Sequence, residues 1–205
     1  MTDLNKSLVE NVRKLLSDYK PEEFTFSKLA KDLGQPMDTL IKAFGNESGL
    51  VEEILAFEQQ NLESVFSDFD YTDINAIDGL LQVSRLISIK FGNILPSINF
   101  DLRQLFPDVR QRFVEKRIQF VNAKIKLNFE EGMQQGLYRP DLSSEWVSRI
   151  YISRLIDMHN PDFFPNESIS FNVLFDVMFE TFILGICTDA GRDYYYKQIK
   201  HLKFV

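Results

Sequence analysis

The sequence predicts an all-α protein, and three observations indicate that class. Apolar residues recur at spacings of three and four along most of the 205-residue chain, which is the period of a helix that buries one face. No stretch alternates apolar and polar residues between hairpin turns, so no strand is expected. Proline and glycine stand at the ends of the apolar runs, where helices begin and stop.

Three short helices are expected in the first 45 residues. The apolar positions of the first are Leu4, Leu8, Val12, Leu15, Leu16 and Tyr19. Pro21 should end this helix, because proline cannot continue the backbone hydrogen bonding. The second, "SKLAKDLG", has Ser27 as its expected N-cap and Gly34 as the left-handed residue that ends it. The third begins after Pro36 and stops at Gly45.

A longer helix should follow Asn46, whose side chain can cap it, with Glu47 and Glu52 near its positive end. Its apolar stripe is Leu50, Ile54, Phe57, Leu62, Val65 and Phe69. The helical pattern then continues over residues 73–95, 96–106, 107–136, 143–160 and 170–187, and in the tail over 191–204. Gly136 should end the third of these stretches, and Ser143 or Ser144 is placed to cap the fourth.

The composition favours a globular, intracellular protein. Apolar residues make up 44% of the chain and 19 residues are Phe, which argues against disorder. A single Cys excludes an internal disulfide, and two His leave no metal-ligand pattern. The polar, amphipathic start "MTDLNKSLVENVRKLL" predicts a cytoplasmic chain without a secretory signal. No nucleophile with a base, metal set or cofactor loop is recognisable, so neither an enzyme nor a cofactor is expected.

The second and third expected helices have the spacing of a helix-turn-helix. In that motif the first helix braces the second, which leaves the exposed face of the second helix free to enter the major groove of DNA. The bracing residues would be Leu29, Ala30 and Leu33 before the glycine, and Leu40, Ala43 and Phe44 after it. An ordinary helical hairpin has the same spacing, so both interpretations stand at this point.

The order of these segments resembles the amino-terminal domain of the TetR/AcrR family of transcriptional repressors. "FSKLAKDLG", "DTLIKAF" and "GNESGLVEEIL" follow the family's usual run, close to "T-hydrophobic-x-x-I-A-x-x-A-G-V-S-x-G-T-L-Y-x-Y-F-x-S-K-E-x-L". The matching residues are Leu29, Ala30, Gly34, Thr39, Leu40, Phe44 and Leu50. Further along, "EEGMQQGLYRPDLSSEWVSRIY" resembles the family's junction between a long helix and the first dimerisation helix. The resemblance implies a helix-turn-helix DNA-binding domain over 1–47 and a larger helical effector-binding and dimerisation domain over 48–205.

Several positions depart from the family's pattern in the segment that would contact DNA. Ile41 stands where the family has a tyrosine, Glu47 where it commonly has a phosphate-binding lysine, and Asp38 where glycine is common. Anions beside the phosphate backbone would weaken binding, and the whole chain has a net charge of -7. The residues that the resemblance implies for DNA contact are Thr25, Lys28, Met37, Asp38, Thr39, Ile41 and Lys42.

Two functions are therefore compatible with the sequence. The first is a ligand-responsive transcriptional regulator of the TetR type, a repressor that binds a double-stranded DNA operator. The second is a TetR-like protein that binds a small molecule or another protein and has lost DNA binding.

The resemblance also implies an effector pocket and a homodimer. A small apolar effector would lie between helices of the larger domain. Its expected lining is Phe91, Phe100, Phe113, Phe120, Trp146 and Tyr151, although each ring can instead be ordinary core. The dimer would form through residues 143–158 and 170–187. Asp176 and Glu180 interrupt the second, very apolar run, so we expect an interface helix and no membrane span.

Overall fold

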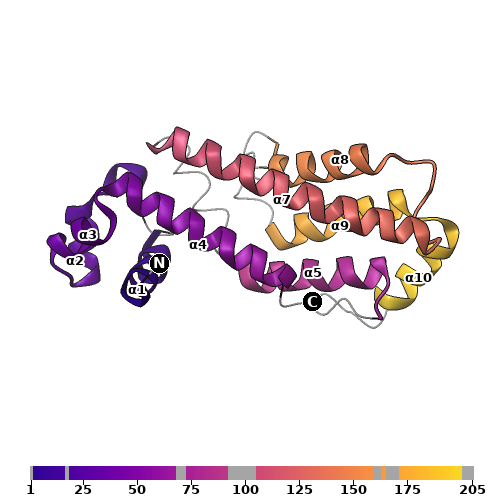
Figure 1. Cartoon of the computed structure of the whole chain (residues 1–205), viewed down its shortest axis with the longest axis horizontal. Helices are drawn as coiled ribbons and strands as arrows, with labels where there is room; N and C mark the ends of the chain where they lie inside the picture. Colours follow the sequence, from indigo (N-terminus) through magenta and orange to yellow (C-terminus); the bar gives the residue numbers. More distant parts are fainter. Residues whose placement is uncertain are drawn as a thin grey trace. The chain divides into compact units, whose positions relative to one another are not determined.

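The computed structural model describes residues 2–16, 19–67, 73–91, 105–158, 163–164 and 171–199. The regular elements of these residues are helices (Figure 1), which confirms the predicted all-α class. They are α1 (Asp3–Leu15), the 3-10 helix η2 (Pro21–Glu23), α2 (Phe26–Leu33), α3 (Met37–Phe44), α4 (Glu47–Ser67), α5 (Ala76–Phe91), α7 (Pro107–Gln134), α8 (Ser144–Asp157), α9 (Phe171–Ile186) and α10 (Asp189–Ile199). One isolated β-bridge joins Tyr138 and Cys187. None of the described helices is both long and apolar enough to cross a membrane.

The chain divides into two compact units, each with its own core. The first unit contains α1 to α3, α4 up to Ser64 and the beginning of α7 up to Arg117. The second contains the end of α4, α5, the rest of α7, and α8 to α10. The sequence predicts a DNA-binding domain that ends at residue 47, at the start of α4. This domain boundary stays a prediction.

The start of α2 differs from the expectation. α2 begins at Phe26, and its cap is Thr25, whose hydroxyl accepts a hydrogen bond from the Lys28 N–H at 3.3 Å. The prediction that Ser27 caps this helix is wrong, because Ser27 already lies in the first helical turn. Gly34 ends α2 with a φ of 62°, as predicted, in a conformation that strains any residue with a Cβ.

The next boundaries agree with the sequence. α3 follows Pro36 and is ended by Gly45, and Asn46 caps α4 by accepting a hydrogen bond from the Gly49 N–H at 2.9 Å. The first half of the stripe predicted along α4, namely Leu50, Ile54 and Phe57, belongs to the core of the first unit, and Leu62 and Val65 further along are buried as well. Phe69, expected at the end of that stripe, lies outside the described residues.

The core of the second unit is rich in aromatic rings. Tyr138, fully buried, stacks on Phe129 with ring centroids 5.6 Å apart. A methyl group at Gly132 would overlap the Tyr138 ring, so the absence of a side chain there permits this packing. Within this unit α8 contacts α9, and α10 contacts α5.

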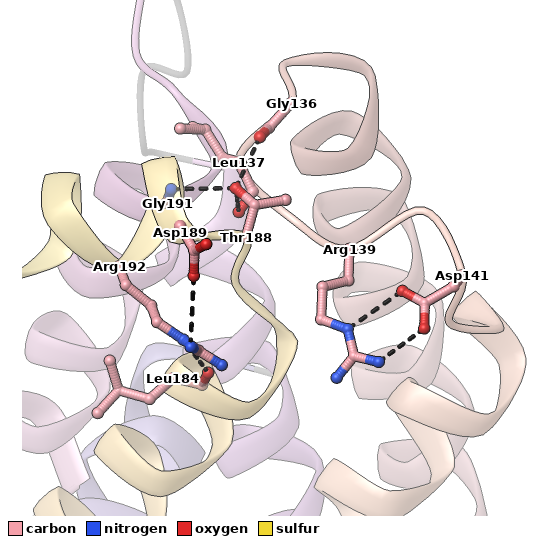
Figure 2. A network of polar contacts seen from close by, with 9 residues as sticks. All are labelled: Gly136, Leu137, Arg139, Asp141, Leu184, Thr188, Asp189, Gly191 and Arg192. Carbon is pink, nitrogen blue, oxygen red and sulfur yellow. Dashed lines mark hydrogen bonds and ion pairs between the residues drawn. The ribbon is translucent and has the colours of Figure 1, made fainter.

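A polar network ties the segment after α7 to the turn between α9 and α10 (Figure 2). The Thr188 hydroxyl donates to the Gly136 carbonyl at 2.8 Å, and the Thr188 N–H donates to the Leu137 carbonyl at 3.0 Å. The Gly191 N–H in turn donates to the Thr188 hydroxyl at 3.1 Å. Gly136 has a φ of 72° just after the end of α7, as its predicted stop requires. The network fixes the junction that precedes α8.

α8 begins after one of the two serines that the sequence offered as its cap. Ser143 occupies the cap position without making a capping hydrogen bond, and the Ser144 hydroxyl donates to Glu130 at 2.9 Å. Residues 96–104 and 200–204, where a short helix and the end of the tail are expected, lie outside the described residues.

Candidate nucleic-acid interface

α2 and α3 form a helix-turn-helix that is held by the core of the first unit. Leu29 of α2 and Leu40 of α3 are completely buried, and Ala30 is buried as well. The Gln35 N–H donates to the Ala30 carbonyl at 2.9 Å, which closes the chain reversal after Gly34. This packing uses one side of α3 and leaves its opposite side exposed.

The exposed side of α3 carries most of the residues predicted to contact DNA. Asp38 and Lys42 are exposed and lie one turn apart. Met37 and Ile41, also one turn apart, are 47% and 41% exposed. Thr39 is half-buried. The face therefore combines one cation, one anion and two large apolar side chains.

Lys28, another predicted DNA contact, interacts with Asp32 of its own helix and with Tyr19. Its ammonium lies 3.1 Å from the Asp32 carboxylate and 5.0 Å from the ring centroid of Tyr19. The Tyr19 hydroxyl donates to the same carboxylate at 2.5 Å. The hydrogen bond from Tyr19 has the larger effect and that from Lys28 the smaller, and together they hold the pKa of Asp32 below its usual value. Tyr19 and Asp32 were not among the predicted site residues, although the four-residue spacing of Lys28 and Asp32 is a signal for that pair.

Glu47 is half-buried at the start of α4, and its carboxylate accepts a hydrogen bond from the Phe26 N–H at 2.8 Å. Phe26 is the first residue of α2, and its N–H is one of the donors that a helix leaves unsatisfied at its beginning. A negative charge is favourable there, because the amino-terminal ends of both helices are positive. Glu47 thus connects the starts of α2 and α4 and also places an anion beside the candidate interface.

Arg13, one of the cations of α1, is largely buried in the first unit. Its guanidinium lies 3.3 Å from the carboxylate of Glu58, which is almost completely buried. Burial raises the pKa of Glu58, while the charges of Arg13 and Arg117 oppose that rise. Arg13 therefore belongs to an internal ion cluster, whereas Lys6 of the same helix is exposed.

The residues expected to line an effector pocket are found in different environments. Phe113 is half-buried against the core of the first unit, whereas Tyr151 is buried in the core of the second. Phe120 is half-buried in the second unit, and Trp146 of α8 is exposed. The side chains of Phe91 and Phe100 lie outside the description. The pocket stays a prediction.

The two helices predicted to form a dimer expose apolar side chains. On α8 these are Trp146 and Ile150, one turn apart. On α9 they are Val173 and Val177, also one turn apart and 57% and 55% exposed. Apolar stripes of this kind on helices that contact each other are typical of a face that a further partner covers.

Neither a protein-family model nor a curated protein matches this sequence. Solved structures share its fold over most of its length. A TetR-family protein from Vibrio parahaemolyticus is 18% identical with a TM-score of 0.60, covering 91% of this chain and 100% of that chain. The TetR-family transcriptional regulator PfmR from Thermus thermophilus is 17% identical with a TM-score of 0.65, covering 86% and 96%. The fatty acid degradation regulator FadR from Bacillus halodurans is 11% identical with a TM-score of 0.70, covering 89% and 96%.

At sequence identities this low, the structural similarity shows the fold alone. The chemistry of the site must be argued from this chain's own residues. The similar structures are covered almost from end to end, so the likeness includes both units rather than the helix-turn-helix alone. The chain has the fold of the TetR-family transcriptional regulators.

Proposed function

We propose that this protein is a dimeric, DNA-binding transcriptional regulator of the TetR type, a repressor that responds to a small apolar effector. The observation that carries the proposal is the exposed side of α3, presented by a well-packed α2–turn–α3 unit within a TetR-type fold. In helix-turn-helix proteins the second helix of the motif lies in the major groove and its side chains contact base edges. The proposal includes no catalysed reaction.

The charges around α3 indicate a modest electrostatic contribution to DNA binding. Lys42 is an exposed cation on α3, but the charge of Lys28 is shared with Asp32. Asp38 and Glu47 add two carboxylates to the same segment. Because each phosphate contact contributes about 0.9 to the slope of log K against log salt, we expect a shallow salt dependence.

Two copies would pair through residues 143–158 and 170–187. Such pairing would cover the exposed stripes of α8 and α9, including Ile150 and Val177, and remove their apolar surface from water. The two α3 helices of the dimer would then contact half-sites about one helical turn, roughly 34 to 36 Å, apart. The operator is therefore expected to be an inverted repeat.

A small apolar effector would bind among the aromatic residues of the second unit, where Phe120 and Tyr151 lie. Such a ligand regulates DNA binding only if it has different affinities for the DNA-bound and the free conformation.

The test is the binding of the purified full-length chain to a labelled fragment of its own upstream region, titrated with salt in the presence of random-sequence competitor. Specific retention supports the proposal. Lys42→Gln should weaken binding and reduce the salt slope by about one, because a phosphate contact is lost. Lys116→Gln, which changes an exposed lysine of α7, should leave both unchanged.

The alternative is a TetR-type protein that has lost DNA binding, and the carboxylates of Asp38 and Glu47 favour it. If competitor removes the protein from the upstream fragment even at low salt, a genome-wide selection for bound fragments becomes the deciding experiment. Recovery of no site there would refute the DNA-binding part of the proposal and support a ligand-binding or protein-binding role.

A further inference from the structure

We propose that Met37 and Ile41 of α3 recognise the methyl groups of thymines in the major groove, so that each operator half-site has thymine at two neighbouring positions. This inference rests on the proposed DNA-binding function and specifies how the site selects its sequence.

The placement of the two side chains supports this role. They are four residues apart on one short helix, so they lie one above the other on the same side. The core requires neither of them, since Leu40 and Phe44 are the buried residues of α3. Single exposed apolar residues are common on protein surfaces. Two of them on one eight-residue helix at a candidate interface indicate that the ligand surface is itself partly apolar.

The chemistry of base edges limits what these side chains can recognise. Guanine, cytosine and adenine present hydrogen-bond donors and acceptors in the major groove, and thymine adds a C5-methyl group. Neither an isoleucine nor a methionine side chain can donate a conventional hydrogen bond. Contact with a thymine methyl is the interaction that removes apolar surface from water on both partners.

The neighbouring residues of α3 can supply the polar part of recognition. Asp38 and Lys42 form a second exposed row, one position further around the helix from Met37 and Ile41. A carboxylate can accept from the cytosine amino group, and a lysine can donate to guanine or to a phosphate. The apolar and the polar row would therefore contact different base positions, and the thymine preference belongs to the apolar row.

The experiment begins with the selection of binding sites for the full-length protein from a library of random DNA duplexes. The C5-methyl groups of the selected site are then removed one at a time. In the selected site, each thymine is replaced in turn by deoxyuridine, which lacks the C5-methyl group and retains the same pairing. At two neighbouring positions of a half-site we expect binding to weaken about three- to fivefold, the effect of one methyl-sized apolar group. Uracil at other positions should have little effect.

Variants assign the methyl groups to their side chains. Ile41→Ala should weaken binding to the thymine site and abolish the penalty for deoxyuridine at one position, and Met37→Ala should do the same at the other. Leu127→Ala, which shortens an exposed apolar residue of α7, should retain both penalties. Thermal unfolding checks that each variant is folded, and the deoxyuridine series on the unchanged protein tests the inference without any variant.

The outcomes separate this inference from the proposed function. If a site is selected but no thymine position responds to methyl removal, or if Ile41→Ala and Met37→Ala retain the full penalties, DNA binding stands and the methyl recognition is refuted. If the library yields no selected site, the DNA-binding proposal fails and the inference fails with it.

Discussion

Glu47 shows how a single side chain can serve the fold and oppose the proposed ligand. Its carboxylate satisfies the Phe26 N–H at the start of α2, and the same negative charge lies in the segment that would approach DNA phosphates. The hydrogen bond requires an acceptor at this position but not a charge, so substitution can separate the two effects.

We predict that Glu47→Gln strengthens DNA binding several-fold at low salt, because the amide oxygen keeps the acceptor and the repulsive charge is gone. The gain should shrink as salt is added. Glu47→Ala should also lower the free energy of unfolding by about 1 kcal/mol, since the Phe26 N–H loses its partner. Fluorescence anisotropy and urea unfolding measure the two effects. Glu10→Gln, an exposed acid of α1, is the control, and an equal gain in affinity for both variants would contradict a specific role of Glu47.

The cluster of Tyr19, Lys28 and Asp32 gives a prediction about pH. The Tyr19 hydroxyl is the main cause of the lowered pKa of Asp32, so Tyr19→Phe should raise that pKa toward its ordinary value of 3.8. A lowered folded-state pKa contributes stability that is present above the unfolded pKa and is lost as the pH falls through the folded pKa. The variant should therefore lose stability at pH 7 and differ little from the unchanged protein below the folded pKa.

Carboxylate titration by NMR and unfolding curves at neutral and acid pH measure this coupling. Tyr196→Phe, at an exposed tyrosine of α10, is the matched control and should leave the titration of Asp32 unchanged. An unaltered Asp32 pKa in Tyr19→Phe would show that the hydrogen bond does not persist in solution.

At the scale of helices, some helix ends depend on one residue alone, and others depend on contacts with distant residues. Gly34 and Gly136 were predictable as stops, because a left-handed backbone conformation favours glycine wherever it occurs. The cap of α2 was predicted at the wrong residue, and the predicted cap position of α8, Ser143, makes no capping hydrogen bond, since a hydroxyl near a helix start has competing partners. At α8 the Ser144 hydroxyl bonds to Glu130 of α7, a contact between two separate helices.

The start of α2 can be tested with two neighbouring hydroxyl residues. Thr25→Ala should lower the free energy of unfolding by about 1 kcal/mol, because its side chain caps the helix. Ser27→Ala should change it little, because Ser27 is exposed within the first turn. Urea unfolding of both variants under the same conditions gives the comparison. A larger loss for Ser27→Ala would contradict the assignment of the cap to Thr25.

At the scale of the whole molecule, the proposed dimer is what allows two α3 helices to bind the two half-sites of one operator. The exposed stripe of α9 is the surface to alter, because its apolar residues face water in one chain and would be covered in a dimer.

Val177→Asp should convert the protein to a monomer in light scattering, since a carboxylate buried in an apolar interface is strongly unfavourable. The helical content should stay the same, and affinity for a full operator should fall toward that for a half-site. Leu127→Asp changes a similarly exposed apolar residue of α7 outside the proposed interface and should leave the dimer intact. A dimer that survives Val177→Asp would exclude this part of α9 from the interface.

The sequence by itself determined the helical class, most helix boundaries and the pair of short helices around Gly34, which the family resemblance identified as a helix-turn-helix. These features depend on apolar periodicity, on glycine and proline, and on spacing within short segments, all of which can be read along the chain. It also determined the segment proposed to contact DNA, since Met37, Ile41 and Lys42 follow the turn within a few residues.

Only the tertiary structure decided which charged groups belong to the interior. Arg13 is paired with Glu58, which is distant from it in the chain, and Glu47 reaches back to the start of α2. It also decided the environments of the aromatic residues, with Tyr151 in a core and Trp146 at the surface. Periodicity identifies the buried face of one helix, but the partner of a charge or a ring depends on which helices pack together.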